Sequence, residues 1–125
     1  MTRPEFQTLL AEIRAAQDKL LSEKGADYTQ QSDDVHHNFK IVAEQLGLTP
    51  LQVWAVYVEK HWLAIMTYIK HGAVASEPIE SRFRDLGNYL LLGEGLLAGK
   101  CVKEKQSISS CRCDSCLEVR ITAGL

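Results

Sequence analysis

The chain of 125 residues has no dominant charge and no unbroken apolar run. Fourteen Lys and Arg residues stand against sixteen Asp and Glu residues, a net charge of −2. This balance provides no positive field for a phosphate backbone and disfavours nucleic acid as the main partner. The most apolar stretch, residues 51–69, contains Glu59, Lys60 and His61, which are costly in lipid, so we expect no membrane partner.

The first twenty residues lack the apolar core of a secretion signal, because charges occur throughout them. We therefore expect a cytoplasmic protein. Cysteine is absent from the first 100 residues, and all four cysteines follow them. Cytoplasmic thiols stay reduced, which favours metal ligands or free thiols over disulfides.

Hydrophobic residues make up 46% of the chain and charged residues 24%, which is typical of one folded domain. No useful alternating strand pattern occurs before residue 100, and the short run 116–122 is the one candidate strand. The sequence predicts a helical domain at 1–99 and a Cys-rich tail at 100–125 that forms a linker or a small hairpin.

Glycine and proline divide the first 99 residues into four amphipathic stretches, which predict an all-α four-helix bundle. The predicted helices run from residue 4 to a stop at Gly25, from a cap at Asp33 or Asp34 to Gly47, from Thr49-Pro50 to Gly72, and from 76–78 to about Leu97. The segment 26–32 is expected to be a loop. Apolar residues at spacings of three and four are predicted to face inward, among them Phe6, Leu9, Val35, Phe39, Leu46, Trp54, Tyr57, Ile65, Tyr68, Phe83, Leu86, Leu90 and Leu97.

Two helices carry polar residues beside their apolar faces. His61 falls among the inward positions of the third helix, either as a core histidine bonded to a tyrosine or carbonyl or as a ligand-binding group. On the fourth helix, Arg82 and Asp85 are three residues apart, and Asn88 follows one turn later. The first two form either an intrahelical ion pair or a site in which Arg82 binds phosphate and Asp85 binds a metal or a basic ligand group.

A resemblance to small phage and bacterial proteins of the nucleotide-modification-associated, MazG-like group covers residues 24–92, a little over half the chain. The matching stretches are EKGADY at 23–28, HNF at 37–39, EKHWLAI at 59–65, SEPIESR at 76–82 and RDLGNYL at 84–90. The resemblance implies a relative of the all-α nucleoside triphosphate pyrophosphatases, encoded by a phage and located in the cytoplasm of its bacterial host.

The same resemblance assigns roles to individual residues. It places Lys60 and Arg82 on phosphate and Tyr28 on a base, and it adds Asp27, His61 and Asn88 to the ligand site. Asp85 and Glu80 are its catalytic, magnesium-holding candidates, since carboxylates on neighbouring helices hold Mg²⁺ in that superfamily.

The chain departs from the acidic runs that the working enzymes share, EExxE and then ExxD. Its third helix has only Glu59, and Arg82 occupies the position three before Asp85. Three functions therefore compete: hydrolysis of a nucleoside polyphosphate, capture of a signalling nucleotide without turnover, and binding and inhibition of a host protein.

The tail carries a separate pattern. Cys101, Cys111, Cys113 and Cys116 are close enough in sequence for several thiolates to hold one structural zinc ion, and reduced, unliganded thiols are the alternative. Apolar residues on more than one side of the third and fourth helices further predict a homodimer or higher oligomer that packs these helices together.

Overall fold

The computed structural model describes residues 1–99, and this part of the chain is all-α. The four helices are α1 (Arg3–Tyr28), α2 (His37–Leu46), α3 (Pro50–His71) and α4 (Ile79–Gly99). The prediction of an all-α four-helix bundle is confirmed. The predicted zinc ligands and the short alternating run at 116–122 lie outside the described residues.

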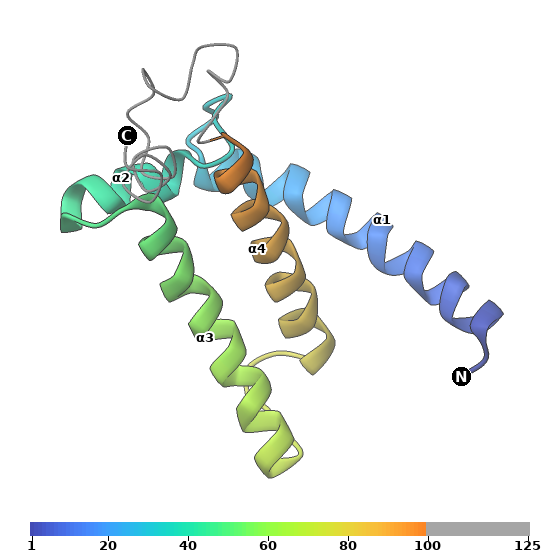
Figure 1. Ribbon diagram of the computed structural model, residues 1–125. Helices are drawn as coiled ribbons and strands as arrows, with labels where there is room; N and C mark the ends of the chain where they lie inside the picture. The colour runs from blue at the N-terminus through green and yellow to red at the C-terminus, as the bar shows by residue number, and fades with distance from the viewer. Residues whose placement is uncertain (100–125) are drawn as a thin grey trace, which may run out of the picture.

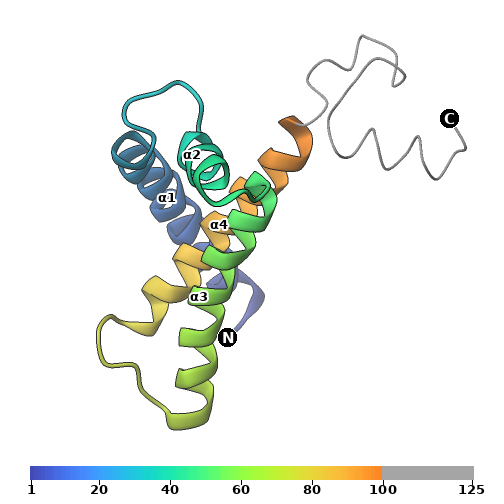
Figure 2. The same cartoon turned by 90° about the vertical axis from the view of Figure 1, so that its left-hand side faces the viewer.

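The helices form two layers. α3 and α4 run antiparallel side by side, while α2 packs on α3 and α1 packs on α4 (Figure 1). α2 and the C-terminal half of α1 lie on the same side of the α3–α4 layer (Figure 2). Within residues 1–99, no helix is both long enough and apolar enough to cross a membrane.

Local sequence signals fix most helix ends. Thr49 and Gln52 form a reciprocal capping box at the start of α3, and Pro50 occupies its first turn. Gly47 and Gly72 end α2 and α3 in the left-handed conformation, at φ 68° and 76°. These three boundaries agree with the sequence-based prediction.

The end of α1 differs from the prediction. Gly25 lies inside the helix, which continues to Tyr28, and the start of the predicted loop at 26–32 is therefore helical. Thr29 ends the helix, since its backbone N–H and its hydroxyl both donate to the Gly25 carbonyl, at 3.0 and 2.7 Å. Gln30 and Gln31 then reverse the chain at positive φ.

The start of α2 also differs from the prediction. The N-cap residue is His36, whose side chain makes no capping hydrogen bond. Asp34 lies two residues earlier, and its carboxylate accepts from the His36 backbone N–H at 3.0 Å. This aspartate therefore shapes the turn that precedes the helix and does not cap the helix directly.

The hydrophobic core is small and lies where α2 meets α3 and α4. Its buried members are Phe39, Ala43, Val53 and Leu96. Ile65 is buried lower on α3. Phe39 is fully buried, as predicted. Val35, which precedes α2, and Leu46, at its C-terminal end, are 60% and 64% exposed, against the prediction.

The inward face of α4 is rotated from the predicted one. Phe83, Leu90 and Leu97 are more than half exposed, because no helix among the described residues covers their side of α4. Asn88 is buried, and Asp85 is only 16% exposed. The predicted polar edge of this helix is thus part of its inner surface. Tyr68 on α3 is likewise exposed rather than inward.

Candidate functional site

A cavity of about 840 Å³ opens between the C-terminal half of α1, the α1–α2 loop and the facing surfaces of α3 and α4. Its volume is in the range of small-molecule sites. The lining brings together most of the residues that the sequence singled out: Tyr28, Lys60, His61, Arg82, Asp85 and Asn88. Asp27 and Glu80 are exposed and do not line it.

Cations from three helices line the cavity. Lys24 of α1 pairs with Asp85 of α4 at 3.4 Å. Arg82 donates from Nη2 to the Ser76 hydroxyl at 2.9 Å, and its Nε lies 3.7 Å from a Glu77 carboxylate oxygen. Three cationic side chains, including that of Lys60, thus stand against two carboxylates in the lining, although the whole chain is negative.

Aromatic side chains form a second wall. Tyr57 and Tyr89 stack with ring centroids 5.8 Å apart and an interplanar angle of 6°, and Phe39 meets both rings edge-on. Burial raises the pKa of the Tyr89 hydroxyl above its ordinary value, and the neighbouring Tyr28 and Tyr57 add to the shift. Tyr28 is 60% exposed, so its ring is accessible from solvent.

Three buried side-chain atoms at the cavity have no hydrogen-bond partner among the described residues: Nδ1 of His61, Nε of Arg82 and Oδ1 of Asn88. His61 and Asn88 are each 7% exposed. A buried polar group without a partner costs about 1–3 kcal/mol. A ligand that bonds to these atoms would offset that cost.

The electrostatic state of His61 follows from its position. Its Nδ1 lies 4.0 Å from Asp85 Oδ2, which is too long for a hydrogen bond. Burial lowers the pKa of His61, Asp85 opposes the shift, and the positive charges of Arg82, Lys60 and Lys24 add to it. The imidazole is therefore neutral at pH 7.

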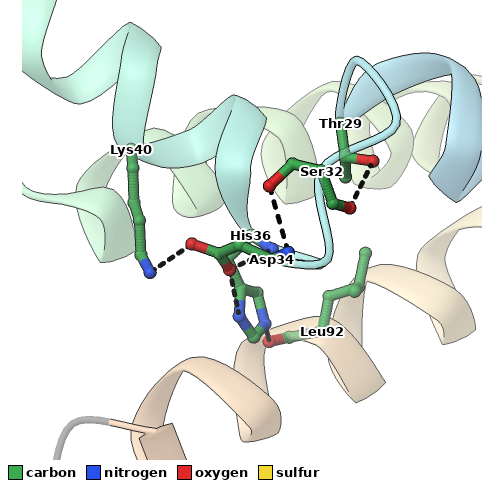
Figure 3. A network of polar contacts seen from close by, with 6 residues as sticks. All are labelled: Thr29, Ser32, Asp34, His36, Lys40 and Leu92. Carbon is green, nitrogen blue, oxygen red and sulfur yellow. Dashed lines mark hydrogen bonds and ion pairs between the residues drawn. The ribbon is translucent and has the colours of Figure 1, made fainter.

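The α1–α2 loop closes one end of the cavity and is tied to α4. Ser32 Oγ accepts from the Asp34 N–H at 3.1 Å, and Asp34 also pairs with Lys40 (Figure 3). His36 Nε2 donates to the Leu92 carbonyl of α4 at 2.9 Å. The hydrogen bond from Lys40 lowers the pKa of the Asp34 carboxyl. These contacts hold the loop against α4 beside the cavity.

The predicted magnesium candidates are not brought together. Asp85 lines the cavity next to Lys24, whereas Glu80 is exposed outside it. Glu77, which the sequence did not single out, is the second carboxylate of the lining. In residues 1–99, no group of three His, Cys, Asp or Glu side chains has the arrangement of a metal site.

Sequence reasoning missed several lining residues. Lys24 lies within the EKGADY stretch but was not assigned a role, and only the tertiary contact with Asp85 shows its place in the cavity. Tyr57 was expected to be inward, but neither Tyr57 nor Tyr89 was assigned to a ligand site. Their stacking depends on the relative rotation of α3 and α4, which spacing within one helix does not determine.

No family model matches the chain, and no curated protein or solved structure matches it either. The resemblance to the MazG-like group therefore stays a prediction. The function is inferred instead from the geometry of the cavity and the chemistry of the side chains that line it.

Proposed function

We propose that this protein binds a nucleoside phosphate in the cavity between α1, α3 and α4. One observation supports the proposal. Three buried polar atoms that have no hydrogen-bond partner among the described residues line the same cavity of about 840 Å³ as three cationic side chains. Both features are what a polar, anionic small molecule requires of its site.

The phosphates are assigned to Lys60 and Arg82. The Arg82 side chain is only 14% exposed, and its Nε lies 3.7 Å from a Glu77 carboxylate oxygen, which is too far for a hydrogen bond. This buried donor has no hydrogen-bond partner among the described residues, so an anionic oxygen would complete its hydrogen bonds. Lys60 is exposed at the cavity and carries no ion pair among residues 1–99. It therefore serves as a mobile point charge for phosphate.

The base is assigned to the aromatic and amide side chains. Tyr28 offers an accessible ring for stacking, and base–aromatic stacking is worth about 1–3 kcal/mol. The Asn88 amide and the His61 imidazole are buried polar groups that can bond to the edge of a base. A bound base would thus supply hydrogen bonds to Asn88 Oδ1 and His61 Nδ1, which have no partner among the described residues.

Binding without turnover is the form of this function that the residues favour. At a phosphate site, Mg²⁺ is held by one or two carboxylates that are free to bind it, together with the substrate phosphates and water. The cavity has only Asp85 and Glu77, each close to a cationic side chain. The described residues do not fit a magnesium site, so the proposal has no metal-dependent step.

Titration calorimetry with ATP, GTP and their deoxy forms, with and without Mg²⁺, tests the proposal. We expect binding with no pyrophosphate release. Lys60→Ala should weaken binding about tenfold, equivalent to about 1.4 kcal/mol, through the loss of a phosphate contact. Lys70→Ala removes a lysine from the same helix outside the cavity lining and should leave the affinity unchanged.

Three results would contradict the proposal. Absence of binding across the panel would exclude a nucleotide site and favour a protein partner. Equal losses in Lys60→Ala and Lys70→Ala would mean that only general charge attracts the ligand. Release of pyrophosphate that Asp85→Ala abolishes would show that the protein is an enzyme after all.

A further inference from the structure

One side of the α3–α4 layer faces away from α2 and the C-terminal half of α1, and no helix within residues 1–99 covers it (Figure 2). Large apolar side chains are exposed on this side. On α3 it carries Trp62 and Ile69, which are 46% and 63% exposed. On α4 it carries Phe83, Leu90 and Leu97, which are 57%, 53% and 55% exposed. These five side chains are large, and none carries a charge.

The helical repeat of α3 places Trp62 and Ile69 on the side of the helix opposite the cavity. His61 is buried toward α4, and successive residues turn by about 100° around a helix. Lys60 precedes His61 and lines the cavity, so Trp62, which follows it, points to the other side of the layer. Ile69 is seven residues further on and lies on the same side of α3.

The same rule applies to α4. The Tyr89 ring lies 5.1 Å from the His61 ring, so Tyr89 faces α3. Asn88 precedes it and lines the cavity, whereas Leu90 follows it on the opposite side. α3 and α4 face each other and run in opposite directions. In such a pair, the residue that follows the facing residue lies on the same side of the layer in both helices. Leu90 and Trp62 therefore share one surface.

This surface, the outer face, is continuous across both helices. Its apolar residues follow the helical repeat; they are Val58, Trp62, Met66, Ile69, Phe83, Leu86, Leu90 and Leu97. One acidic residue, Glu94, follows Leu90 by about one turn and is exposed at the margin of this face. Aromatic side chains bury about 150–250 Å² each when covered and aliphatic ones about 100 Å², so this partly exposed set offers on the order of 500 Å² of apolar surface. A standard interface takes about 800 Å² from each partner, of which about 60% is non-polar, and the apolar area of the outer face is close to that share.

We propose that a second copy of this chain covers the outer face. Two α3–α4 pairs packed face to face around a two-fold axis form a four-helix core, and each copy offers the other the same apolar surface. The apolar centre of the outer face suits its own copy, since Glu94 at the margin stays at the polar, solvent-accessible rim of the interface. The two cavities then open outward, away from the interface, and each is complete within one subunit.

Sedimentation velocity at micromolar concentration tests this proposal without any ligand. We expect a species of twice the chain mass for the natural protein, and the mass of one chain for Leu90→Glu, which places a charge on the outer face. Leu91→Glu is the matched control. Leu91 is the next residue on α4, 49% exposed and turned away from the outer face, so this variant should remain a dimer.

Fluorescence of the natural protein provides a second measurement of dimer formation. Trp62 lies on the outer face, so its emission should shift to shorter wavelength as the concentration rises through the dimerisation range. The shift should be absent from Trp62→Phe. A natural protein that stays monomeric at micromolar concentration, as it would if residues 100–125 covered the outer face, overturns the proposal. So does a dimer that Leu91→Glu disrupts and Leu90→Glu does not.

Discussion

His61 lies where the cavity, the core and the charged residues of α4 meet. Its ring packs against Tyr89 at 5.1 Å, and its Nδ1 has no hydrogen-bond partner among the described residues. Spacing along α3 correctly predicted that this side chain is inward. The expected bond to a tyrosine or carbonyl is absent in residues 1–99, since a helical pattern gives the direction of a side chain but not the atoms that it meets.

The shifted pKa of His61 predicts a pH dependence of stability. Burial lowers its pKa in the folded state, whereas the unfolded chain keeps a value of about 6.5. The folded protein therefore binds fewer protons, and the free energy of unfolding should fall as the pH drops below about 7, until the folded-state pKa is passed. Urea denaturation at pH 7.5 and 5.5, without ligand, measures this fall.

His61→Phe keeps an aromatic ring that cannot titrate, so the fall between these two pH values should be smaller in this variant. His71→Phe, at the exposed C-terminal end of α3, is the control and should show the fall of the natural protein. A His61→Phe variant with an unchanged pH dependence would mean that burial of His61 does not control it.

The polar residues of α4 were predictable only in part. Arg82 and Asp85 were recognised as neighbours three residues apart, with an ion pair between them as one alternative. Each instead contacts a residue from another part of the chain, Ser76 and Lys24 respectively. These partners depend on how α1 and the α3–α4 loop pack, which spacing on α4 does not encode.

At the scale of helices, glycine has two opposite roles. Gly25 lies in the interior of α1, where an added Cβ meets nothing within 4 Å. Gly93 lies where α4 crosses α3, and a Cβ there would come within 2.5 Å of the Trp54 indole. That indole is itself held by a hydrogen bond from its Nε1 to the Tyr89 carbonyl. Gly25 is therefore replaceable, and Gly93 permits the close approach of α3 and α4.

The two alanine substitutions should have opposite effects on stability. Gly25→Ala should raise the free energy of unfolding by about 0.5–1 kcal/mol, because alanine is the better helix former. Gly93→Ala should lower it by about 1–3 kcal/mol, since the crowded indole must shift. Urea denaturation of both variants measures the difference. If Gly25→Ala instead lowered the free energy of unfolding, α1 would end near Gly25, as the sequence predicted.

Helix boundaries were predictable where the signal is local. The Thr49-Pro50 start and the Gly47 and Gly72 stops depend on capping and on backbone conformation within a few residues. The inner face of α4 was not predictable in this way. Its apolar stripe through Phe83, Leu90 and Leu97 is regular, but a stripe does not say whether the same chain or another one covers it.

For the whole molecule, the all-α four-helix bundle was predicted correctly, whereas the faces that its helices turn inward were predicted only in part. Among the described residues, five hydrophobic side chains are buried, while fifteen large ones are exposed. The oligomer stays a prediction, and the outer face gives it a location. In the proposed dimer, the charged residues of the cavity lie away from the interface.

The attachment of α1 has a consequence for motion. α1 has no buried residue, and it contacts the rest of the fold mainly through α4. Its C-terminal half also forms one side of the cavity, so a bound molecule would touch α1 and the other helices at once. Ligand binding should therefore slow amide hydrogen exchange in the last turns of α1 and leave the first turns, which are far from the cavity, exchanging as before.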